Sequence, residues 1–169
     1  MNPVLARWNT LSPTDAASAV LPCCSSHAWA NALAACRPIP DEHALLEAST
    51  TIWRSLPESA WQKAFDSHPR IGERHAQTES TSQSLAWSAQ EQRAATPDEA
   101  AKQTLAEANR RYEQKFGRIF IVCASGKSAA EMLAILQGRL GNDPEAELAV
   151  AAEEQRKITR IRLEKLLTP

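Results

Sequence analysis

Ser67-His68-Pro69-Arg70-Ile71-Gly72-Glu73 is the stretch around which the chain is organised, because it places a rigid loop between two long helical patterns. Pro69 disfavours the α region for His68, so the preceding helix should end there and the imidazole should leave the helical register. Gly72 then permits a tight turn. Histidine has the unperturbed pKa nearest neutrality, so an imidazole fixed on such a loop is suited to proton transfer. The structural alternative is a helix-terminating loop with an incidental surface histidine.

The composition predicts a soluble globular protein with a single domain over residues 1–169. Hydrophobic residues make up 43% of the chain and the formal net charge is -1, which gives no electrostatic footprint for nucleic acid or an anionic membrane. No apolar run approaches the ~18 residues of a membrane span, and the N-terminus does not resemble a signal peptide. The four cysteines, with Cys23 and Cys24 adjacent, suggest no disulfide framework, so a reducing cytoplasm is the expected location.

Scarce glycine and prolines placed just before periodic apolar segments predict an all-α protein, a single-domain bundle of about eight helices. The expected helices begin at Ser12, Ser26, Asp41, Pro57, Leu85, Thr96, Ser128 and Asn142. Thr96 stands three residues before Glu99, which is the spacing of a capping box. The polar stretch 74–83 predicts an exposed loop.

A short apolar run, residues 119–124, departs from this helical pattern. Its β-branched residues predict one short extended segment near 119–124, with a buried helical turn as the alternative. Because a single strand has no partner strand, we expect its backbone groups to bind something else.

The final helix carries an arginine on its apolar side. At about 100° per residue, Arg162 projects between Ile158 and Leu166, whereas Arg160 points nearly opposite. An arginine on a buried stripe is costly unless its five donors find partners. The sequence leaves two interpretations open: a structural arginine that is ion-paired or snorkels to solvent, or one that faces an internal polar pocket.

A second polar cluster lies on the short helix that begins near Leu85. Ser88, Glu91 and Gln92 are spaced i, i+3 and i+4, so one face presents a hydroxyl, a carboxylate and an amide. Such a face is usually only solvated. Together with His68 and Arg162, however, it suggests an acid–base site with a clamp for an anion.

Four ordered motifs resemble the OHCU decarboxylases, the 2-oxo-4-hydroxy-4-carboxy-5-ureidoimidazoline decarboxylases of urate degradation. The motifs are His68-Pro69-Arg70-Ile71-Gly72, Ser88-x-x-Glu91-Gln92, Asn109-x-x-Tyr112-x-x-Lys115-Phe116-Gly117 and Lys157-Ile158-x-x-Ile161-Arg162-Leu163. The resemblance covers nearly the whole chain and departs from the family pattern at Ile39 and Arg118, where aromatic residues are common. It implies an all-helical fold, a homodimer and no metal or organic cofactor. Some relatives carry a fused transthyretin-like domain, for which this chain is expected to be too short.

The resemblance also implies roles for individual residues. His68 would be the catalytic histidine and Glu91 its acidic partner. The implied substrate-binding residues are Pro69, Ser88, Gln92, Phe120, Ile121, Val122, Cys123, Ala124 and Arg162. The substrate, OHCU, carries its carboxylate beside an imine, so loss of carbon dioxide sends electrons onto the ring nitrogen and leads to (S)-allantoin. The protein then has to position the substrate, move protons and stabilise developing charge.

Two other classes of function compete with an enzyme of this family. Cys23-Cys24-x-x-His27, with His43 and His75 elsewhere, offers metal-ligating side chains but lacks the Cys-x-x-Cys spacing of a zinc site. A noncatalytic helical interaction module would keep the fold without its chemistry. The presence of both His68 and Glu91 favours the enzyme.

Overall fold

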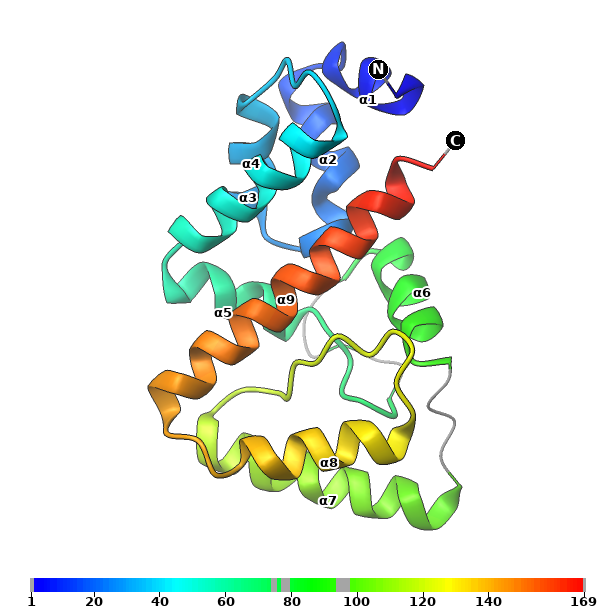
Figure 1. Ribbon diagram of the computed structural model, residues 1–169, viewed down its shortest axis with the longest axis vertical. Coiled ribbons are helices and arrows are strands. Elements are labelled where there is room, and N and C mark those ends of the chain that lie inside the picture. Colours follow the sequence, from blue (N-terminus) through cyan, green and yellow to red (C-terminus); the bar gives the residue numbers. More distant parts are fainter. Residues whose placement is uncertain (1, 74–75, 77–79, 94–97, 169) are drawn as a thin grey trace. The chain divides into compact units, whose positions relative to one another are not determined.

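The computed structural model describes residues 2–73, 76, 80–93 and 98–168, which form nine helices and no strand ladder (Figure 1). This confirms the all-α prediction. The chain divides into two compact units, Met1–Ala64 with Arg156–Pro169 (the first unit) and Phe65–Gln155 (the second unit). Within the described residues, no helix combines the length and apolar character that crossing a bilayer requires.

Most helices begin where local capping signals place them. Their bounds are α1 Pro3–Asn9, α2 Pro13–Cys24, α3 His27–Ala35, α4 Glu42–Ser55, α5 Glu58–Asp66, α6 Ser82–Glu91, α7 Glu99–Phe116, α8 Ala129–Arg139 and α9 Pro144–Leu166. The side chains of Ser12, Ser26 and Asp41 each accept a hydrogen bond from the backbone three residues later, as N-caps do. The first helix was not predicted, because seven residues are too few to show a hydrophobic period.

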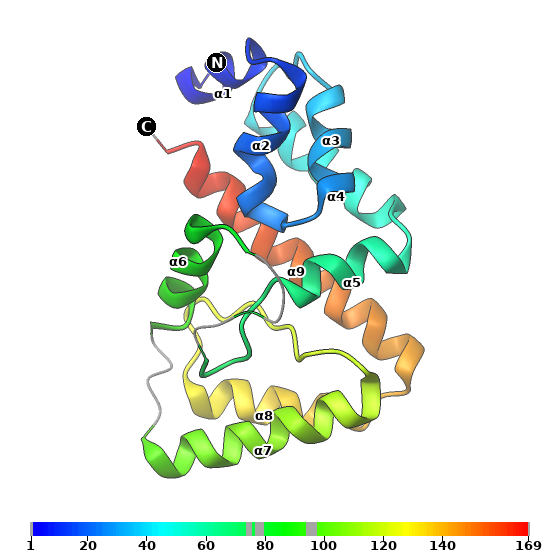
Figure 2. The same cartoon turned by 180° about the vertical axis from the view of Figure 1, so that it is seen from behind.

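In the first unit, α2 and α3 lie side by side in both views and share a core (Figures 1 and 2). Trp29 and Leu33 of α3 are fully buried. The loop that follows is fixed by Arg37, whose Nη1 donates to the carbonyls of Trp8 (2.9 Å) and Leu11 (2.8 Å). These bonds hold the helices of the N-terminal part against one another.

In the second unit, α7 and α8 lie side by side in both views (Figures 1 and 2). Tyr112 and Leu105 of α7 pack with Met132 and Leu136 of α8 in one hydrophobic cluster. The capping box expected at Thr96 falls on a residue outside the described ones. Asp98 caps α7 by accepting the Ala101 N–H at 2.8 Å.

The apolar run between α7 and α8 is neither helix nor strand, which excludes the buried helical turn. Gly117, at φ 68°, ends α7 in the left-handed region that glycine adopts easily. Residues 119–124 then cross the second unit as a non-helical ribbon (Figure 1) with every side chain buried. Ser128 begins α8 with a complete capping box to Glu131.

Candidate active site

His68 is a buried residue, which rules out the incidental surface histidine. The helix before it, α5, ends at Asp66, and the His68 N–H donates to the Phe65 carbonyl at 3.1 Å. Only 8% of His68 is exposed. Its Nε2 lies 2.7 Å from Oε1 of Gln155, a residue of α9 that is fully buried. The imidazole is therefore held by a side chain 87 positions away in the sequence.

The loop after His68 is fastened to α7 by two polar side chains. Arg70 makes a bidentate ion pair with Glu113, with Nε–Oε1 at 2.5 Å and Nη2–Oε2 at 3.0 Å. Hydrogen bonding by Glu113 raises the pKa of the Arg70 guanidinium further above its ordinary value. One turn earlier on α7, Asn109 Nδ2 donates to the Ile71 carbonyl at 3.2 Å. Asn109, which belongs to the motif found in this part of the sequence, thus serves to shape the histidine loop, together with Glu113, which that motif does not specify.

The same loop is tied to α6 through Gln92. The Gly72 N–H donates to Oε1 of Gln92 at 3.0 Å, at a backbone φ of 90° that favours glycine. Gln92 is the residue after the last turn of α6, beside the half-buried Glu91, and Ser88 is buried one turn earlier. The predicted polar face therefore exists, and the amide oxygen of Gln92 holds the loop.

The non-helical run 119–124 gives its backbone groups to charged side chains. Arg139 Nη1 donates to the Ile121 carbonyl at 2.6 Å, and the Cys123 N–H donates to Glu154 Oε2 at 2.8 Å. Lys127 Nζ donates to the Cys123 carbonyl at 2.7 Å. The expectation that this segment's backbone binds groups other than a strand is confirmed for these two residues.

Arg139 is itself fixed by a buried carboxylate. Glu147, in the first turn of α9, is fully buried and accepts from Arg139 Nε at 2.8 Å and Nη2 at 2.5 Å. Asn142 Nδ2 donates to its other oxygen at 2.9 Å, and the Tyr112 hydroxyl also donates to Glu147. Burial, and then this hydrogen bond, raises the pKa of Tyr112. This network could not be predicted from the sequence, because an acid in the first turn of a helix usually indicates only an exposed charge.

The carboxylate of Glu91 interacts electrostatically with Cys123 of the non-helical run. Burial raises the pKa of the Cys123 thiol, Lys127 lowers it, and the carboxylates of Glu154 and Glu91 raise it further. The end of α6 is therefore within electrostatic reach of Cys123. The second unit accordingly contains all the predicted site residues except one, on elements that side-chain hydrogen bonds connect: His68, Pro69, Ser88, Glu91, Gln92, Phe120, Ile121, Val122, Cys123 and Ala124.

The remaining predicted residue, Arg162, belongs to the first unit. It is 1% exposed, and its Nη1 donates to the Pro22 carbonyl at 3.3 Å. Arg160 is exposed and pairs with Glu164 at 3.0 Å. The helical projection of the two arginines is confirmed. Snorkelling to solvent is excluded for Arg162, whereas its role in a site stays a prediction.

The cysteine pair has the environment of core residues. Cys23 and Cys24 are buried at the end of α2, whereas His27 is exposed. Burial raises the pKa of both thiols, that of Cys24 to about 12, and the nearby Arg162 offsets only part of this. Thiolate, the form that binds metal, is disfavoured there. Among the described residues, which omit His75, no three His, Cys, Asp or Glu side chains converge as metal ligands.

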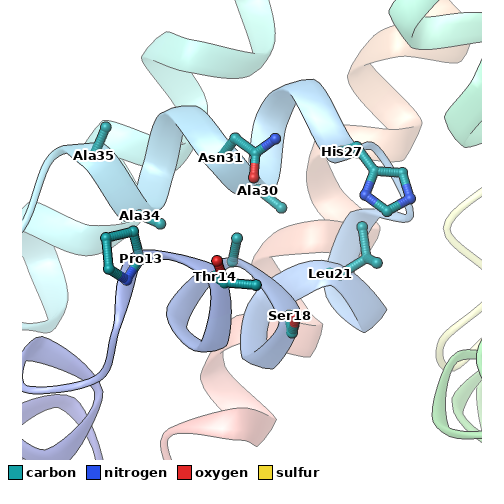
Figure 3. Close-up of a pocket in the computed structure, with 10 residues that line it drawn as sticks. Pro13, Thr14, Ser18, Leu21, His27, Ala30, Asn31, Ala34 and Ala35 are labelled. Carbon is teal, nitrogen blue, oxygen red and sulfur yellow. The ribbon is translucent and has the colours of Figure 1, made fainter.

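A cavity of about 510 Å³ lies between α2 and α3 in the first unit (Figure 3). Thr14 and Ser18 of α2 and His27 and Asn31 of α3 line it together with alanines. None of the predicted site residues is among the residues that line it. Its walls carry small, mostly neutral side chains and no acid–base pair.

The fold and the polar loop define the class, an all-helical protein with a buried histidine on a tethered loop. The sequence profile of the OHCU decarboxylases matches residues 9–164, so the chain belongs to that family, as its motifs predicted. It is 38% identical over 147 residues to the uric acid degradation bifunctional protein TTL of Arabidopsis thaliana, which covers 86% of this chain and 45% of that protein. It is 39% identical over 59 residues to a 2-oxo-4-hydroxy-4-carboxy-5-ureidoimidazoline decarboxylase of Amia calva, covering 35% of this chain and 34% of that one. The chain thus spans less than half the length of these curated relatives.

Solved structures agree with this assignment. An OHCU decarboxylase whose structure was determined in the presence of (S)-allantoin superposes with a TM-score of 0.75 at 38% identity, covering 88% of this chain and 96% of that one. An (S)-allantoin synthase at 20% identity has a TM-score of 0.74, covers 96% of this chain and 53% of its own, and shows the shared fold.

Proposed function

We propose that this protein is a cofactor-independent carboxy-lyase that converts OHCU to (S)-allantoin in urate degradation. The observation that carries the proposal is His68, buried and fixed on its loop in the same unit as Glu91. Family membership and the related OHCU decarboxylase studied with (S)-allantoin support the choice of substrate. The substrate's own imine accepts the electrons released with carbon dioxide, so positioned acid–base groups suffice for the chemistry.

His68 and Glu91 carry the proton transfers in this proposal, and Ser88 and Gln92 bind the substrate. With Oε1 of Gln92 occupied by Gly72, its amide N–H₂ group is the part that donates to the substrate. Pro69 lines the pocket. Each of these residues lies on a backbone that polar side chains hold in place, which keeps the reacting groups in register.

The run from Phe120 to Ala124 contributes backbone contacts, and the structure supports Val122 as their centre. The Ile121 carbonyl and both backbone groups of Cys123 are bound by side chains. Val122 lies between them, 4% exposed, and its N–H and C=O have no hydrogen-bond partner within the described part of the chain. A buried peptide group without a partner is costly, and a substrate with amide and ureido groups would satisfy both of its ends.

Arg162 binds substrate oxygens on which negative charge grows during the reaction. A tight pair with the departing carboxylate would stabilise the ground state and slow the reaction, because only interactions that strengthen in the transition state accelerate it. The planar guanidinium suits ring or ureido oxygens of this kind.

We also propose that residues 1–169 act as one domain, as a cytoplasmic homodimer whose ligand is the small molecule OHCU. The free state of Cys23, Cys24, Cys36 and Cys123 supports a reducing compartment. The homodimer rests on the family resemblance alone.

The test is a decarboxylation assay on freshly generated OHCU with chelator-treated protein. We expect faster decay of OHCU than in buffer and an optically active allantoin product. Loss of activity on chelation with recovery on adding a metal ion contradicts the cofactor-independent mechanism. No acceleration with or without metal favours the noncatalytic helical module instead.

A further inference from the structure

The contact between His68 and Gln155 distinguishes the two nitrogens of the imidazole. Oε1 of Gln155 lies 2.7 Å from Nε2, and both residues are buried. An amide oxygen accepts hydrogen bonds and does not donate them, so the nitrogen that faces it carries the hydrogen. In a neutral imidazole the lone pair then resides on Nδ1.

We propose, resting on the function proposed above, that Gln155 is a positioning residue that keeps a proton on Nε2 of His68. Nδ1 is then the nitrogen that exchanges protons with the substrate. Gln155 does not touch the reacting atoms in this scheme; it acts through the orientation and tautomer of the histidine.

The position of Gln155 on α9 is itself fixed. Its neighbour Glu154 accepts the Cys123 N–H at 2.8 Å, so one turn of α9 holds both the histidine and the non-helical run. The amide is also a neutral acceptor. A carboxylate would hold the same Nε2–H but would favour the imidazolium, whereas a neutral amide places no charge beside the ring.

The proton that Nδ1 takes up is returned, and water supplies one further proton. The substrate hydroxyl gives its proton to the Nδ1 lone pair, and the bond to the carboxylate breaks as carbon dioxide leaves. That electron pair forms the carbon–carbon double bond, and the imine pair moves to the ring nitrogen, which takes a proton from water. Nδ1 then returns its proton to the carbon that was part of the imine as the hydroxylated carbon becomes the ketone, while the proton on Nε2 stays bonded to Gln155 throughout. No oxidant or reductant is required.

The experiment is ¹⁵N NMR of the histidines in the full chain, which has four, with the His68 signals identified by their loss in His68→Ala. Protonated and unprotonated ring nitrogens have well-separated ¹⁵N shifts, so the neutral tautomer is read directly. In the wild type we expect the Nε2–H tautomer. In Gln155→Leu we expect that preference to be lost and kcat to fall about 10²-fold, as a misoriented catalytic group does.

Two further variants sharpen the result. Gln155→Glu keeps an acceptor oxygen and should restore the Nε2–H tautomer, with titration of His68 moved to higher pH. Gln137→Leu, an exposed glutamine of α8, should change neither the spectrum nor kcat.

A neutral His68 with its proton on Nδ1 overturns the proposal, and so does an unchanged tautomer in Gln155→Leu. If Gln155→Leu does not fold, the wild-type spectrum still decides. The Nε2–H tautomer in a protein that does not decarboxylate OHCU overturns the proposed function instead, so the two failures are distinguishable.

Discussion

The two units of this protein are stabilised in different ways. In the first unit, helices begin at local caps and pack through Trp29, Leu33 and their neighbours. In the second, a loop and a non-helical run are held mostly by side chains 18 to 87 positions away, as in the Ile121–Arg139 and His68–Gln155 contacts. Irregular backbone has to find its hydrogen bonds outside a helix or sheet, so it depends on such tethers. The candidate catalytic groups lie on the tethered backbone, where orientation can be set independently of helix geometry.

The largest expected effect falls on the chemistry of the second unit. His68→Ala and Glu91→Ala should each lower the decarboxylation rate by roughly 10² to 10⁴, the usual contribution of a positioned acid or base. Helical content measured by circular dichroism should be unchanged. His43→Ala, at an exposed position of α4 in the first unit, is the matched control and should keep the wild-type rate. Near-full activity in either site variant removes that residue from the mechanism.

The next effect tests the buried ion pair between Arg139 and Glu147. Arg139→Met leaves Glu147 buried without its cation, which should reduce the free energy of unfolding by about 3–5 kcal/mol. Adding Glu147→Leu to the same chain should recover part of that loss, because the unpaired charge is then gone. Denaturant unfolding measures both. Arg160→Met, which removes an exposed i,i+4 pair, should cost less than about 1 kcal/mol. Equal losses at the two arginines would mean that the buried network does not stabilise the second unit.

A smaller effect separates the two interpretations of Arg162. Arg162→Lys keeps the charge but loses the planar fork, so kcat/KM should fall about tenfold or more. This corresponds to a loss of roughly 1.4 kcal/mol in transition-state stabilisation, and the melting temperature should stay near normal. Arg160→Ala should be nearly silent in both measurements. A lower melting temperature with normal kinetics would make Arg162 a structural residue that serves only the core beside Cys23 and Cys24.

The smallest effect concerns a strained cap in the first unit. Ser25 ends α2 at φ 58° and ψ 23°, and its buried hydroxyl has no hydrogen-bond partner among the described residues. Ser25→Gly should therefore raise the free energy of unfolding by about 0.5–1 kcal/mol, since glycine adopts this region without a Cβ penalty. Ser18→Gly, at an exposed interior position of the same helix, should lower it by about 0.5 kcal/mol. If both variants changed the free energy of unfolding in the same direction, backbone conformation would not control the effect of these substitutions.

Local signals in the sequence were enough for most of the helices. Ser12, Ser26 and Ser128 cap their helices as predicted, because a cap joins groups only three residues apart. The helical periodicity of apolar positions correctly predicted that Arg162 is buried and that Arg160 is exposed. The His-Pro loop and the non-helical run were also identified, since proline, glycine and a compact β-branched run each restrict the backbone locally.

Only the tertiary structure decided what those elements bind. Nothing near Gln155 or Glu154 in the sequence indicates that they hold His68 and the Cys123 backbone, and Glu147 resembled an ordinary helix-start acid. These contacts join groups that are far apart along the chain, and hydrophobic periodicity carries no information about such pairs. The sequence by itself therefore determined most of the helices and which residues could do chemistry. Packing decided which nitrogen of His68 faces an acceptor and which side chains bind the backbone of Ile121 and Cys123, because both depend on groups that meet only in the folded protein.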